Sequence, residues 1–360
     1  MEAPATLVLT TETSPDTLLH TRRIVGCLYD NSANVSSLGP VSVITLCLDE
    51  IDKRHYVLKK SSKLDRLHDY MVEEVRNEAA LIGRNVLAHP NIVRGLFAFE
   101  TEHNVYLGME FASGGTLLDY FVEQRRTRLG EGEVFWACRR LFSAVEFVHS
   151  AGYVHCDIKP ENVLLMGRYP RIDQTSVLKL ADFGYCKSLK NLPDRRTGSP
   201  EYAAPEMWRA GNTNTERTDV WACGVVFYIL CYGEMPFGMQ PEDVHTGKTE
   251  EQVVISRIAQ CHPYRLVRPF NHRERASPSA SAMDLIRLML EKNAACRPSM
   301  AECNAHDFIT GRRRPAPGAL VQHQVVKTKS CAAESATVIG ESAPVALKTQ
   351  TPNTRSRLSG

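Results

Sequence analysis

The chain has 360 residues, of which 43% are hydrophobic and 23% charged, as in an ordinary globular protein with a buried core. Its formal net charge of +2 gives no reason to expect a nucleic acid or a membrane surface as partner. Its 11 cysteines contain no C-x-x-C pair, which argues against a zinc site or a disulfide framework and favours reduced thiols in an intracellular protein.

The first 22 residues are rich in Thr, Ser and Pro, and no basic stretch followed by an apolar core is found there. This composition is typical of a flexible leader and excludes a secretory signal. From Arg23 to about Phe111, short apolar runs predict strands at Val41–Leu48, Tyr56–Lys60 and Val105–Phe111.

One long helix is predicted within this strand-rich part, at about Leu67–Leu87, because apolar residues recur there three and four positions apart. After residues 113–115 (Ser-Gly-Gly) the periodicity becomes helical, as in Leu117–Arg125 and Glu133–Ser150. A further apolar run, Val220–Gly233, is shorter than the roughly 20 residues that span a bilayer, so we expect a buried helix.

A β-rich part followed by a helical part predicts an α+β fold with an N-lobe at 23–111 and a C-lobe at 112–310. The Gly-Gly pair would be the hinge, and ligands usually bind between such lobes. Residues 311–360 carry eight Lys or Arg against two Glu and almost no aromatic residues. We expect this last stretch to be a disordered basic tail.

The strongest chemical signal is the stretch from His155 to Asn162, H-C-D-I-K-P-E-N. Asp157 would accept or orient the proton of an attacking hydroxyl, while the amide oxygen of Asn162 would bind a metal. Lys159 is close enough in sequence to stabilise a transferring phosphoryl group by its charge. In isolation, the same Asp and Asn spacing also fits a turn between a helix and a strand.

The next motif favours the chemical interpretation. Twenty residues after Asn162, an apolar strand ends in Asp182-Phe183-Gly184. Asp182 can hold Mg²⁺ between the β- and γ-phosphates of a nucleotide, and Gly184 allows a sharp backbone turn. The stretch Ser199–Glu206, S-P-E-Y-A-A-P-E, follows at the end of the intervening loop.

With H-x-D-x-K-P-E-N, D-F-G and A-P-E in this order, the sequence resembles the protein kinases over about residues 23–310. The resemblance implies the bilobal protein kinase fold, ATP with Mg²⁺, protein substrates and a monomeric catalytic domain. Lys159, and Ser199 in place of the Thr of G-T-P-E-Y, resemble the serine/threonine branch. We therefore expect a serine/threonine protein kinase inside the cell, in the cytoplasm or the nucleus.

The resemblance also assigns residues to the nucleotide. Lys59, in the V-L-K match to V-A-I-K, would hold the α- and β-phosphates, with its neighbour Lys60 as an alternative one position along. Glu78 would orient Lys59, and Glu73 and Glu74 are the other candidates on the same helix. Further nucleotide contacts implied in this way are Gly39, Ile44, Val57, Leu164, Met109 at the back of the adenine pocket, and Glu110 and Ala112 in the hinge.

Three residues receive structural roles from the resemblance. Asp219, in D-V-W-A-C-G, would cap the backbone of the loop that begins with His155. Arg297, in C-R-P-S, would pair with Glu206 of the A-P-E motif, and such a buried pair costs roughly 3–5 kcal/mol to break.

Two positions depart from the family pattern. Counting back from Lys59 places the phosphate-covering loop G-x-G-x-x-G-x-V at Ser37–Ile44, where only Gly39 survives. Glycines there let backbone N–H groups approach phosphate, so we expect weakened ATP binding. Cys156 replaces the arginine that pairs with a phosphorylated activation-loop residue. We therefore expect activity without phosphorylation between residues 184 and 199.

These departures leave a pseudokinase, an interaction module without useful catalysis, as the main alternative. A small-molecule phosphotransferase is a further one, although such relatives generally lack the A-P-E and D-V-W segments. Retention of Lys59, Asp157, Asn162 and Asp182 favours an active kinase. Because strongly arginine-directed relatives carry Glu where this chain has Thr116 and Ile229, an upstream arginine in the substrate is not expected to be essential.

Overall fold

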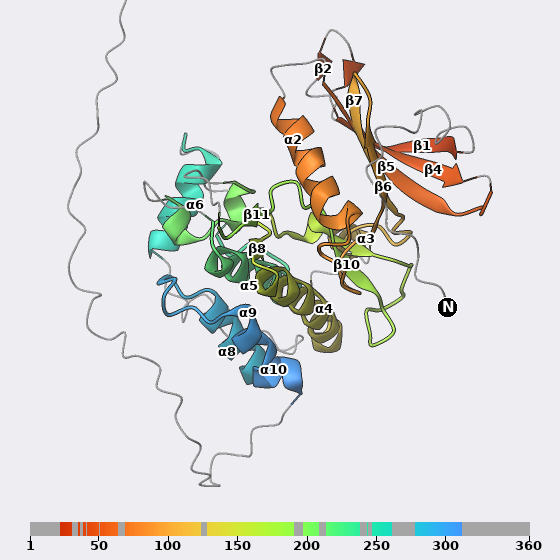
Figure 1. Cartoon of the computed structure of the whole chain (residues 1–360). Helices are drawn as coiled ribbons and strands as arrows, with labels where there is room; N and C mark the ends of the chain where they lie inside the picture. The colour runs from red at the N-terminus through yellow and green to blue at the C-terminus, as the bar shows by residue number, and fades with distance from the viewer. Residues whose placement is uncertain are drawn as a thin grey trace, which may run out of the picture. The chain divides into compact units, whose positions relative to one another are not determined.

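Five strands form one antiparallel sheet in the N-terminal part of the chain (Figure 1). Across the sheet they are β1 (Arg22–Asp30), β4 (Ser42–Asp49), β5 (His55–Ser62), β7 (Asn104–Glu110) and β6 (Gly95–Glu100). Two further two-residue strands, β2 (Val35–Ser36) and β3 (Gly39–Pro40), pair with each other. The three strands predicted from apolar runs are confirmed as β4, β5 and β7.

The computed structural model describes residues 22–30, 35–36, 39–40, 42–49, 51–63, 69–123, 128–190, 197–208, 214–237, 243, 247–260 and 278–311. The chain divides into a unit at 1–314 and a unit at 315–360, and every described residue belongs to the first. The predicted leader at 1–22 and tail at 311–360 therefore lie, apart from Arg22 and Gly311, outside the described residues.

Helix α2 (Asp69–Glu78) packs against β5 and β7 through buried apolar side chains such as Val72 and Val75. The predicted continuation to Leu87 is wrong, because the α-helix gives way to a π-helical turn at Ala79–Gly83. Gly95 of β6 explains the stop: a Cβ on Gly95 would lie 2.7 Å from the Cα of Gly83. The end of the helix and the strand thus pack backbone against backbone.

The segment after β7 contains the two predicted hinge glycines. A Cβ on Gly114 would lie 2.2 Å from the carbonyl oxygen of Gly167, and Gly115 has a φ of +73°. Close backbone approach therefore requires the first glycine, and left-handed backbone favours the second. Helix α3 (Leu117–Glu123) begins directly afterwards.

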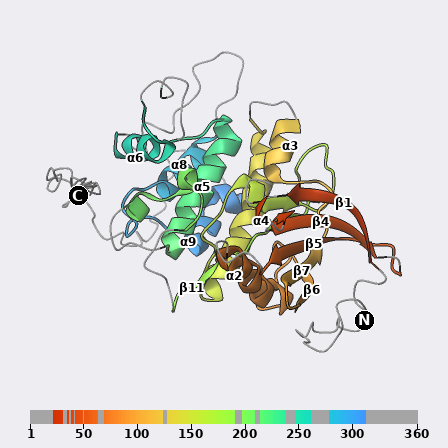
Figure 2. The same ribbon diagram turned by 90° about the horizontal axis from the view of Figure 1, so that it is seen from above.

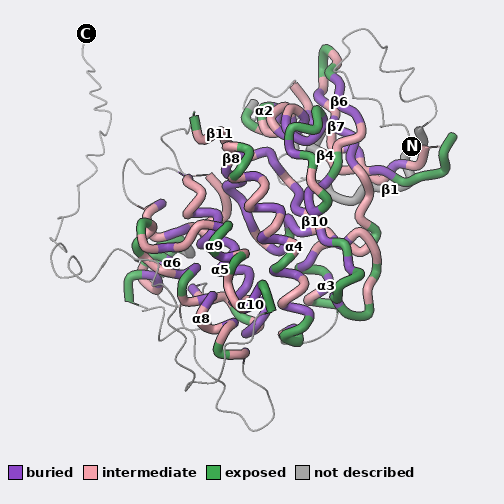
Figure 3. The backbone as a smooth tube through the Cα atoms, turned by 60° about the horizontal axis from the view of Figure 1, so that its bottom comes forward, coloured by how far each residue is buried: buried purple, intermediate pink, exposed green. Residues whose placement is uncertain are grey.

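Helices dominate the remainder of the described chain, as Figures 1 and 2 show. They are α4 (Glu131–Ser150), α5 (Glu216–Tyr232), α6 (Glu250–Gln260), α8 (Ala280–Met289), α9 (Met300–Asn304) and α10 (Asp307–Thr310). Helix α5 packs against α4 and α8 and is buried along most of its length (Figure 3). The buried helix predicted at 220–233 is thus confirmed.

Four short strands lie in the described part of the C-lobe, next to the two motifs H-C-D-I-K-P-E-N and D-F-G. They are β8 (Tyr153–Val154), β9 (Val163–Leu165), β10 (Leu178–Leu180) and β11 (Lys187–Ser188), and they pair as β8 with β11 and β9 with β10. These two small antiparallel pairs bring the stretch after β8 beside the stretch after β10. The sheet-rich N-lobe and helical C-lobe confirm the predicted α+β bilobal fold.

Seven described cysteines are buried and free. Cys296 is disulfide-bonded, so the expectation of a fully reduced set is wrong at that position. Among the helices of the described ranges, none combines the length and the apolar character needed to cross a membrane.

Candidate active site

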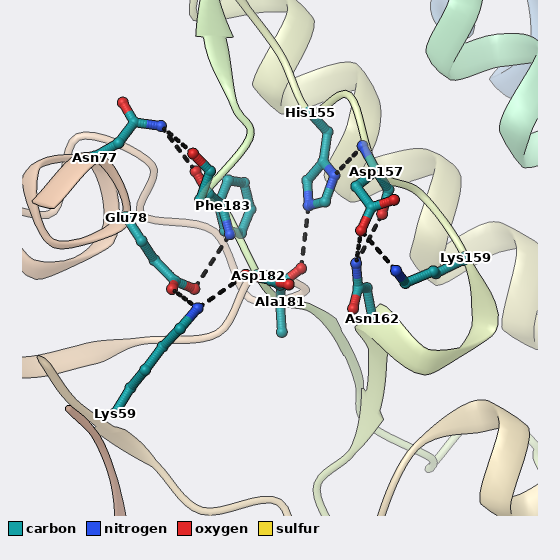
Figure 4. A network of polar contacts seen from close by, with 11 residues as sticks. Lys59, Asn77, Glu78, His155, Asp157, Lys159, Asn162, Ala181, Asp182 and Phe183 are labelled. Atoms are coloured by element: carbon teal, nitrogen blue, oxygen red, sulfur yellow. Dashed lines mark hydrogen bonds and ion pairs between the residues drawn. The ribbon is translucent and has the colours of Figure 1, made fainter. Parts of the chain in front are cut away.

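Lys59 of β5 forms ion pairs with two carboxylates, one on α2 and one in the C-lobe. Its Nζ lies 2.8 Å from Oε2 of Glu78 on α2 and 3.0 Å from Oδ1 of Asp182, which follows β10 (Figure 4). The other oxygen of Glu78 accepts a hydrogen bond from the backbone N–H of Phe183 at 3.1 Å. One buried carboxylate therefore fixes both the lysine and the backbone beside Asp182.

Charge stabilises this group strongly. Burial opposes the positive charge of Lys59, but Asp182 and Glu78 outweigh it and raise the pKa of the ammonium. In turn the Lys59 charge lowers the pKa of the Asp182 carboxyl, against the opposing effect of burial. Asp182 also has a φ of +63°, which turns its carboxylate toward Lys59 at the cost of left-handed backbone.

Asp157 lies at the centre of a second cluster. Its Oδ1 accepts hydrogen bonds from the backbone N–H and the hydroxyl of Ser199 at 3.0 and 2.9 Å. Its Oδ2 lies 2.8 Å from Nζ of Lys159 and 3.1 Å from Nδ2 of Asn162. The Lys159 ammonium also donates to the Ser199 hydroxyl at 2.9 Å. The sequence-predicted catalytic residues thus share one hydrogen-bonded network.

Asn162 connects the two clusters. Its Nδ2 donates to the backbone carbonyl of Asp157 at 2.8 Å, and its own backbone carbonyl accepts from the N–H of Ala181 at 2.9 Å. Since Ala181 precedes Asp182, this bond holds the two candidate metal ligands next to one another. An amide oxygen and a carboxylate are the hard oxygen donors that Mg²⁺ prefers, so these residues fit that ion.

Asp219 of α5 fixes the loop that begins with His155. Its carboxylate, only 1% exposed, accepts from the backbone N–H groups of His155 at 2.8 Å and Cys156 at 3.0 Å. The His155 ring contacts the Ala181 carbonyl at 3.1 Å and packs edge-on against Phe183. These contacts agree with the cap expected at Asp219.

Arg297 and Glu206 form a bidentate ion pair. Nη1 and Nη2 of Arg297 lie 2.7 and 3.0 Å from the two Glu206 oxygens. The guanidinium also donates to the backbone carbonyls of Arg217 and Glu291, and it lies over the Trp221 ring. The pair therefore ties the A-P-E segment to the C-lobe core, as the resemblance implies.

The residues expected around the adenine occupy neighbouring strands. Ile44 pairs with Lys59 across β4 and β5, and Val57 pairs with Met109 across β5 and β7. Leu164 lies on β9 and forms a bridge with Thr116 just beyond the hinge. Cross-strand partners and residues two apart share a face, so Ile44, Val57 and Met109 lie on the same face of the sheet as Lys59, whereas Leu164 belongs to another strand pair. Their contacts with nucleotide stay predictions.

Three expected nucleotide residues lie elsewhere. Gly39 is in β3, opposite Ser36, and no described contact joins it to Lys59. The pairing of Asp30 with Val43 shows that residues 31–41 connect β1 to β4, so the loop alignment stays a prediction. The Glu110 side chain faces Lys179 of β10 at 2.5 Å, and Ala112 lies in the segment after β7.

Sequence reasoning missed Asn77. Its Nδ2 donates to three backbone carbonyls, those of Phe183, Gly184 and Cys186, at 2.8–3.0 Å. It thereby holds the segment after Asp182 against α2, next to the Glu78 contact. A polar residue beside Glu78 on the inner face of a helix was the only available signal, and it does not identify the distant carbonyls.

The thiols near the site are not reactive groups. Cys156 and Cys186 are 7% and 1% exposed, and burial raises the pKa of both thiols. A protonated, enclosed thiol is a poor nucleophile. Both cysteines are therefore packing residues.

Comparison with known proteins agrees with this geometry. The family model described as "Protein kinase domain" matches residues 37–309. The chain is 32% identical over 256 residues, 70% of its length, to "Hormonally up-regulated neu tumor-associated kinase" of Mus musculus, and equally to the protein of that name from Homo sapiens. It is 32% identical over 275 residues, 75% of its length, to "Calcium-dependent protein kinase 2" of Arabidopsis thaliana.

The matched stretches cover 32% of the first two relatives and 39% of the third. The chain thus spans about a third of the length of these kinases. Its family match extends from the sheet to the last described helices. The chain belongs to the protein kinase family.

Proposed function

We propose that this chain is an ATP- and Mg²⁺-dependent protein kinase that transfers the γ-phosphoryl group of ATP to Ser or Thr hydroxyls of proteins. The observation that carries the proposal is the joining of Asp157, Lys159 and Asn162 in one network, next to the Lys59–Asp182 ion pair. A carboxylate base, a cation and two oxygen ligands are the groups that phosphoryl transfer requires.

Each residue has one task in this reaction. Lys59, held by Glu78, binds the α- and β-phosphates. Asp157 accepts the proton of the substrate hydroxyl as the new bond to the γ-phosphorus forms and the bond to the departing ADP oxygen breaks. Lys159 offsets the negative charge of the phosphoryl group as it passes from the ADP oxygen to the substrate hydroxyl.

Asn162 and Asp182 would hold the metal. The Nδ2 of Asn162 is engaged by Asp157, and none of the described residues donates to its amide oxygen, which leaves that oxygen for an ion. Bound Mg²⁺ neutralises charge on the β- and γ-phosphates. Ser199, in contact with both Asp157 and Lys159, supports serine/threonine specificity.

The proposal includes the extent of the unit. We assign the catalytic domain to residues 23–310, acting as a monomer, with a leader before it and a basic tail after it. We also propose that substrates do not need an arginine upstream of the acceptor. A degenerate peptide array with a dominant upstream-arginine requirement would contradict this last point.

The test is a radiolabelled-ATP assay with Mg²⁺ on a peptide library and on a generic basic protein. Wild type should label Ser and Thr, whereas Asp157→Ala and Asp182→Asn should remove labelling. Wild type without transfer, or with transfer equal to that of Asp157→Ala, would replace the proposal by the pseudokinase alternative. Labelling of tyrosine alone would contradict the assigned specificity.

A further inference from the structure

The end of the activation segment lies directly on the catalytic loop. Gly198 has a φ of +96°, and a Cβ there would lie 2.1 Å from the carbonyl oxygen of Cys156. On one side of this contact Ser199 donates twice to Asp157. The position of Thr197–Ser199 therefore bears directly on the orientation of the catalytic carboxylate.

Asn214, just before α5, holds the other side. Its Oδ1 accepts from the backbone N–H of Thr197 at 3.2 Å and from the Thr197 hydroxyl at 3.0 Å. Its Nδ2 approaches the Thr197 carbonyl at 3.4 Å. Asn214 is only 6% exposed, so these bonds form away from competing water.

The described side chains that line this contact are neutral or acidic, and Lys159 lies beside them on the Ser199 hydroxyl. Cys156 stands here in place of the expected arginine, and it lines the same cavity as Thr197. A small cavity is lined by Cys156, Thr197 and Asn214 together with Asp157 and Asp219, and its described lining contains no lysine or arginine. A phosphate on Thr197 would thus face carboxylates without a cation in this lining.

We propose that Asn214 is a positioning residue, which fixes Thr197 and thereby keeps Ser199 on Asp157 without activation-segment phosphorylation. Two anchors, Asn214 and Asp157, hold the three-residue segment on either side of Gly198. The effect on catalysis rests on the proposed kinase function, whereas the ordering of the segment does not.

Hydrogen exchange tests the ordering independently of activity. Asn214→Ala should speed exchange of the Thr197 amide about five- to tenfold, because this amide loses its buried acceptor. Exchange of the Ser199 amide should rise by a smaller factor, because its own bond to Asp157 stays while the neighbouring anchor is lost. The matched control is Asn304→Ala, which removes a half-buried amide that bonds to Phe142 and Glu146 in the C-lobe. Exchange at 197–199 should stay unchanged in the control, and an unchanged rate in Asn214→Ala overturns the proposal.

Kinetics tests the consequence. Asn214→Ala and the isosteric Thr197→Val should each lower kcat/KM for peptide about tenfold. The KM for ATP should stay within twofold of wild type. Thr197→Ser, which keeps a hydroxyl, should have the activity of wild type. The double variant should be no worse than Asn214→Ala alone, because Asn214→Ala already removes the hydroxyl bond that Thr197→Val removes. Additive losses, or an ATP KM that rises equally, would refute a positioning role.

Phosphatase treatment separates the two ways of holding the segment. Wild type should keep its activity, as should Ser188→Ala. Lys187 of β11 pairs with Val154, two residues before Cys156, and is a described cation that could serve a phosphate instead. A loss of more than tenfold on dephosphorylation would therefore overturn the proposal. An inactive wild type would refute the kinase assignment but leave the exchange result standing.

Discussion

The two ends of the site are built by different means. At the proposed nucleotide end, defined here as Lys59, Glu78 and Asp182, the lysine forms ion pairs with both carboxylates, and the three residues come from three separate parts of the chain. At the proposed acceptor end, defined as Asp157, Lys159, Asn162 and Ser199, three of the residues come from one loop and the contacts include neutral donors. The carboxylate that binds the cation is buried at both ends, with the Glu78 side chain 1% and the Asp157 side chain 3% exposed, whereas the Lys59 side chain is 13% and the Lys159 side chain 22% exposed.

Because the two ends differ in this way, we expect them to differ in how much they contribute to folding stability and to turnover. At the nucleotide end, loss of the cation leaves a buried carboxylate without its main partner, so geometry and folding energy are coupled. At the acceptor end, Lys159 can turn toward solvent when its partner changes. Substitutions should therefore affect folding at the first end and mainly turnover at the second.

The largest effect is expected from Asp157→Asn. Loss of the base should lower kcat by about 10²–10⁴, since this is the usual contribution of a general base. The free energy of unfolding should fall by less than about 2 kcal/mol, because the amide still accepts from Ser199. Steady-state kinetics and urea unfolding measure the two quantities, and a comparable loss in both would break the comparison.

Lys59→Met comes next. It should lower kcat by about 10²-fold and also lower the free energy of unfolding by about 3–5 kcal/mol, because Glu78 is left buried without its cation. The control is Lys60→Met on the opposite face of β5, expected within about 0.5 kcal/mol of wild type. Equal effects of the two substitutions would reassign the strand lysine.

Glu100→Gln should have the smallest effect. Hydrogen bonds from Arg76 lower the pKa of Glu100 to about 2, with a further contribution from Lys63. Since an unfolded glutamate titrates near about 4.3, the stabilisation is present above that pH and is lost as pH falls toward 2. The group is half exposed, so the loss at pH 7 should be below about 1 kcal/mol.

Urea unfolding of this variant at several pH values gives the check. The difference from wild type should shrink toward pH 2 and in 1 M salt, where surface charges are screened. If the difference in unfolding free energy depended on neither pH nor salt, the exposed Glu100 ion pairs would behave like the buried Lys59–Glu78 pair, contrary to the expectation.

Local patterns identified much of this molecule in advance. Short apolar runs located β4, β5 and β7, and the uniform apolar character of α5 marked it as buried. The spacing between Asp157, Asn162 and Asp182 was enough to expect one site, because each follows or precedes a short strand. The end of α2 was misplaced, since the close approach of Gly95 to the backbone of Gly83 appears only in the folded chain.

The sequence by itself determined which residue types are present and how short segments fold, because periodicity and turn chemistry act over a few residues. Tertiary structure alone decided that Asn77 binds three carbonyls after Asp182, and that Asn214 binds Thr197. Those partners are separated by 17 to 109 positions, and spacing along a chain carries no record of such distant encounters. Packing of the helices and strands brings these groups together, and a buried amide then bonds to whichever backbone it meets.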